Sequence, residues 1–243
     1  MRKCRDVKKR TIRGFTLIEL LVVIALIASL LAILMPVLGK ARSAAMRLKC
    51  ASNLRQVHFA VNMYLDSYDD KFPCAEDPVS TDPFYWLWMG RGWRGLIEPY
   101  LAVTIDANNP SVLLCPWDRT DKDKYERTSY SYSMAFYHSP AQIDAMTSFT
   151  DTYSNPQPSI AQISSKVSKP TGKIIFGEWL SNHLRVDGPD GGWWDWKGRR
   201  NYLFVDGAVR FVKATKLREA NDGYPDVNLT KGGIAGWDWP SPE

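Results

Sequence analysis

The first strong pattern in the chain is a long apolar run near its N-terminus. Residues 15–38 read FTLIELLVVIALIASLLAILMPVL, and the residues of this run that are not apolar are Thr16, Glu19, Ser29 and Pro36. About 20 consecutive apolar residues are enough for a helix to cross the hydrocarbon core of a bilayer. The run therefore predicts a transmembrane helix over residues 15–38.

Helical periodicity continues beyond the apolar run. Apolar residues and one histidine recur every three or four positions, at Ala44, Leu48, Ala51, Leu54, His58, Val61, Leu65 and Tyr68. This spacing is typical of one face of a helix, so residues 39–70 are predicted to continue the stem as an amphipathic helix that packs on a globular body. The two parts give one helix of about 50 residues, roughly 80 Å long. Asp69, Asp70 and Pro73 are expected to end it.

Short strand-like segments follow within residues 71–243, the predicted globular domain. Residues 173–179 (KIIFGEW) form one apolar strand candidate, and residues 201–205 and 208–212 flank the dipeptide Asp206-Gly207. Asp-Gly is preferred in two-residue type I′ turns, so this segment predicts a β-hairpin. A long helix followed by short strands favours an α+β fold, in which a small antiparallel sheet packs on the helix.

The positive charge of the chain is concentrated at the N-terminus. Residues 1–14 contain seven basic residues and one acidic residue, so they carry +6, whereas the whole chain carries +5. The remainder is close to neutral, which gives no electrostatic reason to expect binding to nucleic acid. A basic segment before an apolar run predicts a cytoplasmic N-terminus and an exported body, anchored by a single pass in the inner (cytoplasmic) membrane.

An ordinary secretory signal peptide and a plain signal anchor are alternative interpretations of the run. A signal peptide has an apolar core of about 7–15 residues and a small-residue cleavage site, and neither fits here. Glu19 argues against both alternatives, because a carboxylate within a membrane helix costs roughly 2.5–3.5 kcal/mol and needs a partner. Cleavage between Gly14 and Phe15 would create an ammonium group about one helical turn away. In a filament, Glu19 of one subunit could then pair with the Phe15 amine of its neighbour.

Residues 13–20 (RGFTLIEL) resemble the class III signal of type IV prepilins and of type II secretion pseudopilins. The resemblance implies cleavage after Gly14 by a membrane aspartyl prepilin peptidase, followed by N-methylation of Phe15 by the same enzyme. It also implies assembly with other pilin or pseudopilin subunits through the N-terminal helix. Pro36 is the twenty-second residue counted from Phe15, a position where many pilin stems carry a proline. Such a proline loosens the helix because it removes one main-chain hydrogen bond.

A second resemblance is to a large pilin-like family with a C-terminal H-X9-DG segment. It is carried by residues 41–42, 50, 53–56, 72–73, 114–116, 118, 129–134 and 201–209. Two departures stand out. Trp196 occupies the position ten before Asp206, where the family has histidine, and Ala208 replaces a frequent second histidine. Any chemistry of those histidines is therefore absent from this chain.

Cysteine usage leaves the disulfide pattern open. If residues 1–14 are removed, Cys50, Cys74 and Cys115 remain, which allows three pairings with one thiol left over. We favour Cys74 with Cys115, because both follow or precede proline in loop-like segments. The alternative is that the cysteines are buried and unpaired. No Cys or His cluster has the sequence spacing of a structural zinc site.

No catalytic motif emerges, so the chain is not expected to be an enzyme. His58, His138 and His183 lie in unrelated contexts, and there is no GxSxG, HExxH or Walker A sequence. The best ligand candidate is the segment 187–195, in which Asp187, Asp190 and Asp195 resemble a calcium loop. Ca²⁺ needs six to eight oxygen ligands and the spacing is not that of an EF-hand, so an ordinary Gly/Asp turn is favoured and no cofactor is expected.

Two functions remain in view. The first is a structural subunit, a pilin or pseudopilin, of a type IV pilus-like or type II secretion filament. The second is a membrane-tethered binding module that recognises glycans through tryptophan-rich loops, since aromatic faces can stack on sugars. The tryptophans of these clusters are Trp86, Trp88, Trp93, Trp193, Trp194, Trp196, Trp237 and Trp239. Packing in cores and interfaces is the more common use of tryptophan.

Overall fold

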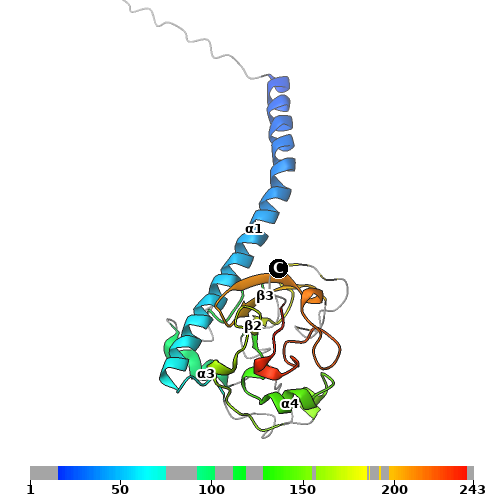
Figure 1. Cartoon of the computed structure of the whole chain (residues 1–243). Helices are drawn as coiled ribbons and strands as arrows, with labels where there is room; N and C mark the ends of the chain where they lie inside the picture. Colours follow the sequence, from blue (N-terminus) through cyan, green and yellow to red (C-terminus); the bar gives the residue numbers. More distant parts are fainter. Residues whose placement is uncertain are drawn as a thin grey trace, which may run out of the picture. The chain divides into compact units, whose positions relative to one another are not determined.

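The chain forms two compact units in a computed structural model, residues Met1–Ser43 and Ala44–Glu243. We call the second unit the body (Figure 1). The structure describes residues 16–74, 92–101, 112–118, 128–154, 157–184, 186, 192 and 197–239.

The longest element is helix α1, Leu17–Ser67, which runs for 51 residues without interruption. Large apolar side chains from Leu17 to Leu38 are exposed, as lipid-facing side chains would be in the absence of a membrane. Within the described residues, α1 is the one helix that is long and apolar enough to cross a membrane. The predicted long N-terminal helix is therefore confirmed.

The C-terminal end of α1 is fixed by two aspartates in the left-handed conformation. Asp69 and Asp70 have φ values of 52° and 59°, and the main-chain N–H of Asp70 donates to the carbonyl of Leu65 at 3.1 Å. Asp tolerates this conformation better than most residues, because its short polar side chain can bond locally. These residues were expected to end the helix, and the structure confirms it.

The face of α1 that packs on the body differs in part from the predicted one. The buried residues of α1 are Cys50, Ala51, Asn53, Leu54, Val57, Ala60, Val61, Tyr64 and Leu65. Ala51, Leu54, Val61 and Leu65 were expected, but Leu48 and Tyr68 are 64% and 49% exposed. The predicted stripe was too long at both ends, because the buried residues of α1 are confined to positions 50–65.

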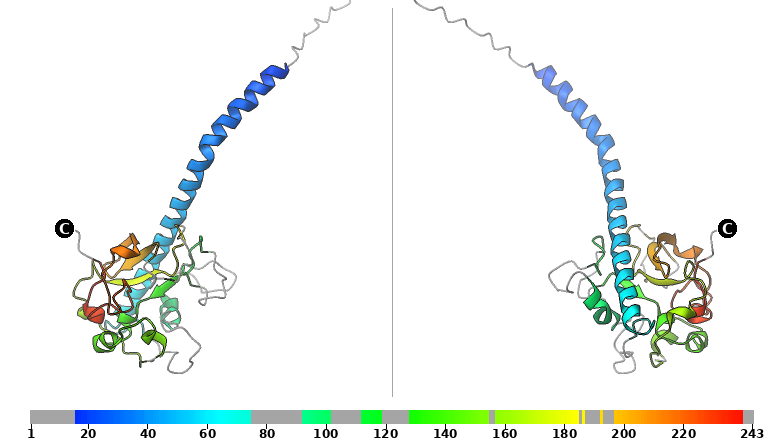
Figure 2. Two further views of the ribbon diagram at one scale, coloured as in Figure 1. Left: turned by 90° about the vertical axis from the view of Figure 1, so that its right-hand side faces the viewer. Right: turned by 60° about the vertical axis from the view of Figure 1, so that its left-hand side comes forward.

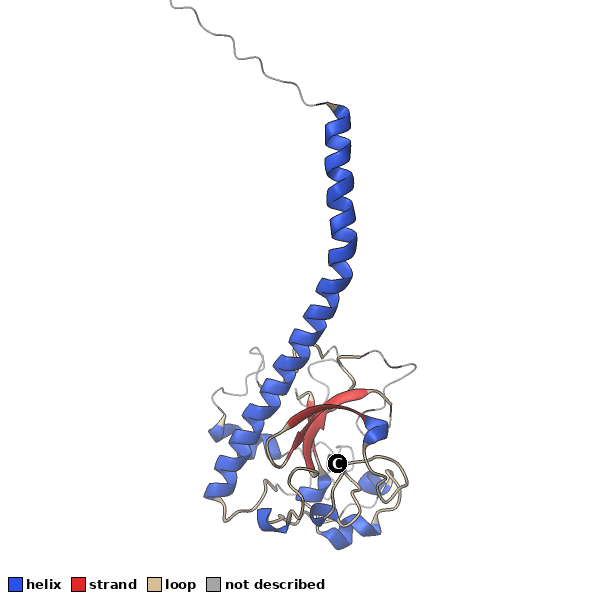
Figure 3. Cartoon of the chain, turned by 45° about the horizontal axis from the view of Figure 1, so that its top comes forward, coloured by secondary structure: helices blue, strands red, loops and turns tan. Residues whose placement is uncertain are grey.

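A four-stranded antiparallel sheet forms the centre of the body (Figure 3). Its strands are β1 (Tyr130–Tyr132), β2 (Ile174–Glu178), β3 (Arg199–Phe204) and β4 (Val209–Lys213), in that spatial order. Strand β2 lies where the KIIFGEW pattern predicted it. The α+β class with a sheet packed on the long helix is confirmed.

The remaining described elements are short. They are α3 (Trp93–Ile97), α4 (Pro140–Ala145), α5 (Asp151–Ser154) and the 3-10 segments η2 (Glu98–Tyr100), η4 (Met134–Phe136), η5 (Ser164–Lys166), η6 (Ala214–Lys216) and η7 (Gly233–Ala235). Helix α4 begins with a capping box, in which the Ser139 and Gln142 side chains satisfy each other's main-chain N–H groups.

The sheet buries different partners on its two faces. On one face, Leu54 and Val57 of α1 belong to the same core as Tyr132, Phe176 and Leu203. The rings of Tyr132 and Phe176 stack with centroids 4.8 Å apart. Each large apolar side chain buried here stabilises the body by about 1.5–3 kcal/mol.

The second face is covered by the part of the chain that follows β4, which we call the C-terminal segment. Trp179, Tyr202 and Phe204 pack there against Leu217 and Val227. In the right-hand view of Figure 2, the cyan part of α1 and the red C-terminal segment lie on different sides of the body. Successive residues of a strand point to opposite faces, so β3 contributes to both cores.

Buried polar groups hold the C-terminal segment to β2. Nζ of Lys173 lies 3.4 Å from Asp238 and donates to Thr230 at 2.7 Å, while Asp238 also accepts from the main-chain N–H of Ile174. Burial lowers the pKa of Lys173, and Asp238 opposes this shift. Burial also raises the pKa of nearby Asp226 to about 7. Removing Lys173 or Asp238 would leave the charge of the other residue uncompensated in the core.

The hairpin between β3 and β4 is present, but its predicted turn type is wrong. Gly207 donates to the carbonyl of Phe204, and Phe204 donates to the carbonyl of Ala208, both at 2.9 Å. The loop therefore has three residues, with Gly207 at φ +84°. Asp206 is not among the described non-glycine residues with positive φ, as a type I′ turn would require. The geometry is that of a type I turn followed by a glycine bulge.

Gly207 provides a stability test of this loop. A Cβ at Gly207 would lie 2.7 Å from Nε2 of His58, whereas Gly223, at φ +78°, has no heavy atom within 4 Å of its Cβ position. We expect Gly207→Ala to lower the free energy of unfolding by about 2 kcal/mol and Gly223→Ala by about 1 kcal/mol. Thermal unfolding of the full chain in detergent measures both. Adding His58→Ala should reduce the loss at Gly207, and equal losses for the two glycine variants would refute the contact.

Candidate functional site

The N-terminal turn of α1 holds its acidic residue in a reciprocal cap. The main-chain N–H and the hydroxyl of Thr16 donate to Oε2 of Glu19 at 2.8 and 2.7 Å. The N–H of Glu19 donates in return to the Thr16 hydroxyl at 3.3 Å. This is a capping box, which satisfies N–H groups that have no partner within the helix.

The capping box corrects one premise of the sequence argument. Glu19 does have a partner within its own chain, so its presence in an apolar helix does not by itself require a partner from a neighbour. The Thr-x-x-Glu signal was present at residues 16–19 and was overlooked. Gly14 and Phe15 lie outside the described residues, and the cleavage junction remains a prediction.

A disulfide joins α1 to the segment that precedes β1. Cys50 and Cys115 are bonded with their Cα atoms 5.1 Å apart, across 65 residues of sequence, and the half-buried Cys74 takes no part in a disulfide. The predicted pairing of Cys74 with Cys115 is therefore wrong. Asn53 brings the two segments together, because its side chain, one turn after Cys50, donates to the carbonyl of Leu114 at 2.9 Å.

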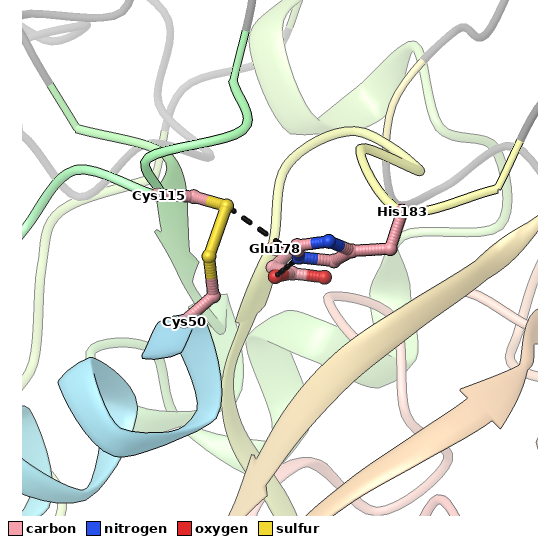
Figure 4. Close-up of side chains that lie close together, drawn as sticks. All are labelled: Cys50, Cys115, Glu178 and His183. Atoms are coloured by element: carbon pink, nitrogen blue, oxygen red, sulfur yellow. Dashed lines mark hydrogen bonds and ion pairs between the residues drawn. A yellow bond between two sulfur atoms is a disulfide. The ribbon is translucent and has the colours of Figure 1, made fainter. Parts of the chain in front are cut away.

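A buried acid–base pair lies beside the disulfide (Figure 4). Nε2 of His183 is 2.9 Å from Oε1 of Glu178 and 3.5 Å from Sγ of Cys115. Glu178 is the last residue of β2 and has no exposed surface. It accepts from the main-chain N–H and the side-chain amide of Asn201, at 2.8 and 2.9 Å. We call Cys50, Cys115, Glu178 and His183 the four-residue cluster.

An aromatic ring with cationic neighbours lies beside the cluster. Phe211 is 6.3 Å from the His183 ring, with guanidinium groups of Arg47 and Arg199 at 4.7 and 5.0 Å from its own ring centroid. Arg47 belongs to α1, and its carbonyl also accepts from Asn201. The surroundings fix the positions of Glu178 and His183. Their burial keeps bulk solvent away, which favours a structural role over catalysis.

The comparisons with known proteins identify the N-terminal segment. The model of the prokaryotic N-terminal methylation motif matches residues 9–35. The chain carries a prepilin-type N-terminus. Residues 17–35 of the motif lie within α1. The long helix and the four-stranded sheet give the chain a pilin-like architecture. Comparisons with curated proteins and with solved structures found no match.

The prepilin-type motif points to a structural subunit, and the predicted ligand residues do not change that conclusion. Asp187, Asp190 and Asp195 lie outside the described residues, so calcium binding there remains a prediction. The histidines are not gathered in one site. Burial lowers the pKa of His138 to about 4, and burial also lowers the pKa of His58, with Asp206 opposing the shift.

The described tryptophans are mainly packed. Trp93 and Trp179 are buried in the two cores of the body. Trp237 is 37% exposed, but the cationic groups of Lys169 and Arg218 lie 5.1 and 4.3 Å from its ring centroid. Trp86, Trp88, Trp193, Trp194 and Trp196 lie outside the described residues. Glycan recognition receives no support from the tryptophans that the structure describes.

The four-residue cluster was not anticipated from the sequence. Its members are spread over more than 130 positions, and no short motif joins them. His183 was noted only as an isolated histidine, and Glu178 was assigned only to a strand. The one usable signal was the count of three cysteines after the leader, which allowed the observed pair without selecting it.

The observed disulfide can be tested against the alternative pairing. Closing a 65-residue loop corresponds to roughly 4 kcal/mol in the chain-entropy treatment, so Cys50→Ala should lower the stability of the oxidised chain by about 2–4 kcal/mol. Cys74→Ala is the matched control and should cost less than about 1 kcal/mol. Chemical denaturation under non-reducing conditions measures both. A peptide map that links Cys74 to Cys115 would contradict the structure.

Proposed function

We propose that the chain is a structural subunit, a pilin or pseudopilin, of a type IV pilus-like or type II secretion filament. The observation that carries the proposal is the prepilin-type motif at residues 9–35, whose residues 17–35 form the first part of the 51-residue helix α1. The N-terminal part of α1 is apolar on all sides, and residues 50–65 bury one face of the helix in the body. This change suits a subunit that is inserted in a membrane and presents a folded body.

In this proposal, the basic leader stays in the cytoplasm and the inner membrane holds the apolar part of α1. A prepilin peptidase cuts between Gly14 and Phe15 and methylates the new amino group of Phe15. The body then lies on the far side of the membrane, where the Cys50–Cys115 disulfide is chemically favoured. The partners are the peptidase, membrane lipid and other subunits of the filament.

The capping box leaves room for an assembly role of Glu19. Both bonds from Thr16 go to Oε2 of Glu19, and no described residue bonds to Oε1. Thr16 and Glu19 both lie after the proposed cut, so the cap survives processing. One carboxylate oxygen can therefore hold the helix start while the other accepts the Phe15 ammonium of a neighbouring subunit.

Processing is the first test. Co-expression with a prepilin peptidase should yield a chain that lacks residues 1–14 and begins with N-methyl-Phe15, as measured by mass spectrometry. Gly14→Leu should block the cut, because a bulky side chain then occupies the junction. Gly39→Leu is the matched control, since a Cβ at Gly39 has open space around it. Cleavage within residues 28–38, or an intact leader in the unsubstituted chain, would overturn the proposal.

Glu19 can be tested by separating its charge from its cap. Glu19→Gln keeps the acceptor that the capping box needs but removes the charge, whereas Glu19→Leu removes both. If a neighbour's ammonium needs the carboxylate, both variants should incorporate into filaments at least about tenfold less well, because an unpaired charge remains in a low-dielectric setting. Processing and membrane insertion should persist in both. Filament yield, leader removal and membrane fractionation measure the three steps.

Thr16→Ala completes this series. This substitution removes the Thr16 hydroxyl that donates to Glu19, and it leaves the Glu19 charge in place. Incorporation of the variant into filaments should therefore stay close to that of the unsubstituted chain. If Glu19→Gln incorporates normally and Thr16→Ala does not, then the helix cap explains the need for Glu19 and the pairing is refuted.

A further inference from the structure

The four-residue cluster brings together the side chains that bind transition metals. One ligand atom each from Cys50, Cys115, Glu178 and His183 lies within 4.8 Å of the other three. They come from four separate segments: α1, the segment before β1, the end of β2 and the segment after β2. All four side chains are buried, and the side chain of His183 is 1% exposed.

The chemistry of this set is specific. Two thiolates and an imidazole favour zinc over calcium or magnesium, and a carboxylate is an accepted fourth ligand. Four protein ligands without access for water are typical of a structural zinc site and unlike an open catalytic one. None of the ligands lies in a motif, because their proximity is created by the fold.

One of the observed distances already matches a tetrahedral ion, and the others require small movements. With bonds of about 2.0 Å to nitrogen and about 2.3 Å to sulfur, such a site places its nitrogen and sulfur donors about 3.5 Å apart. Nε2 of His183 and Sγ of Cys115 are 3.5 Å apart. Oε1 of Glu178 is 2.9 Å from the same nitrogen, so a small outward movement would open that edge. The two sulfur atoms must separate, which requires the disulfide to be reduced.

The surroundings already orient the acidic ligand. Asn201 donates two hydrogen bonds to Glu178, one to each carboxylate oxygen. Outer-shell donors of this kind hold a ligating carboxylate in place. A zinc ion would also provide positive charge next to a fully buried carboxylate, whose ion pair in the described part of the chain is with His183.

We propose that the four-residue cluster is a structural zinc site in the reduced protein, and that zinc and the disulfide are alternative clamps at the same place. A dithiol reductant supplies two electrons and two protons; the S–S bond breaks, the dithiol becomes a disulfide, and Cys50 and Cys115 become thiols. Zn²⁺ then displaces the two thiol protons and forms two Zn–S bonds, while Glu178 and His183 supply the remaining ligands. The zinc form ties four segments together, whereas the disulfide ties two.

The test uses the full chain in detergent micelles with Cys4 and Cys74 replaced by serine, so that the cluster holds the only thiols. A phosphine reduces the disulfide and is itself oxidised with oxygen from water; a control sample stays oxidised. After metal removal, zinc or cobalt(II) is added and excess metal is washed away. We expect one zinc per reduced chain and none per oxidised chain. Cobalt should give the thiolate charge-transfer and tetrahedral absorption bands.

Variants distinguish a built site from adventitious binding. Cys50→Ser and Cys115→Ser should abolish the cobalt charge-transfer bands or strongly reduce them, and His183→Gln should weaken zinc binding at least about tenfold. Asn201→Ala, which removes an orienting donor, should weaken it about tenfold. His58→Gln is the matched control for histidine and should change nothing. Equal binding by His183→Gln and His58→Gln would overturn the assignment of His183 and with it the proposed site.

A folding measurement covers the case in which reduction destabilises the chain. Thermal unfolding of the reduced chain is followed by circular dichroism with and without zinc. Zinc should raise the melting temperature of the reduced chain and leave that of the oxidised chain unchanged. A reduced chain that zinc neither binds nor restabilises would show that the cluster serves the disulfide alone.

Discussion

The structure depends on one helix that must satisfy two different surroundings. The N-terminal part of α1 is apolar on every side and buries nothing within the chain, whereas residues 50–65 bury one face in the body. A bilayer core requires the first pattern, because lipid contacts the helix all around. A globular core requires the second, because water covers the rest of the helix. Both patterns lie on one uninterrupted element, so the folding of the body is tied to the membrane anchor.

Within the body, a few buried polar groups determine which segments meet. On the α1 side of the sheet, Asn53 of α1 donates to the carbonyl of Leu114 and Asn201 donates to Glu178. On the other side, Lys173 and Asp238 hold the C-terminal segment. A buried polar group loses free energy unless it is paired, so each of these residues has few acceptable neighbours. Apolar packing supplies most of the stability of the two cores, and these groups restrict the body to one arrangement.

The sequence allowed the long helix, its end at Asp69 and Asp70, strand β2 and the β3–β4 hairpin to be predicted, because each depends on a local pattern. The hairpin turn was misassigned because Asp-Gly also fits a loop in which only Gly207 has positive φ. The buried face of α1 was misjudged because burial is set by the extent of the body, and because a hydrophobic pattern does not detect Asn53. Cys50, Cys115, Glu178 and His183 are brought together only by tertiary packing, so no spacing rule could have found their cluster.

The position of Cys50 also decides how the body would respond to mechanical tension. A pulling force transmitted along α1 reaches Cys50 near the start of the packed face. From there it passes through the disulfide to Cys115, in the segment that precedes β1. The 64 residues enclosed by this crosslink, including the packed turns of α1 from Ala51 onward, are thereby bypassed and carry little of the load. The noncovalent contacts along the packed face of α1 would then not be broken one after another by the load. In the proposed filament, a subunit under tension would gain from such a bypass, since a covalent bond outlasts the packing around it.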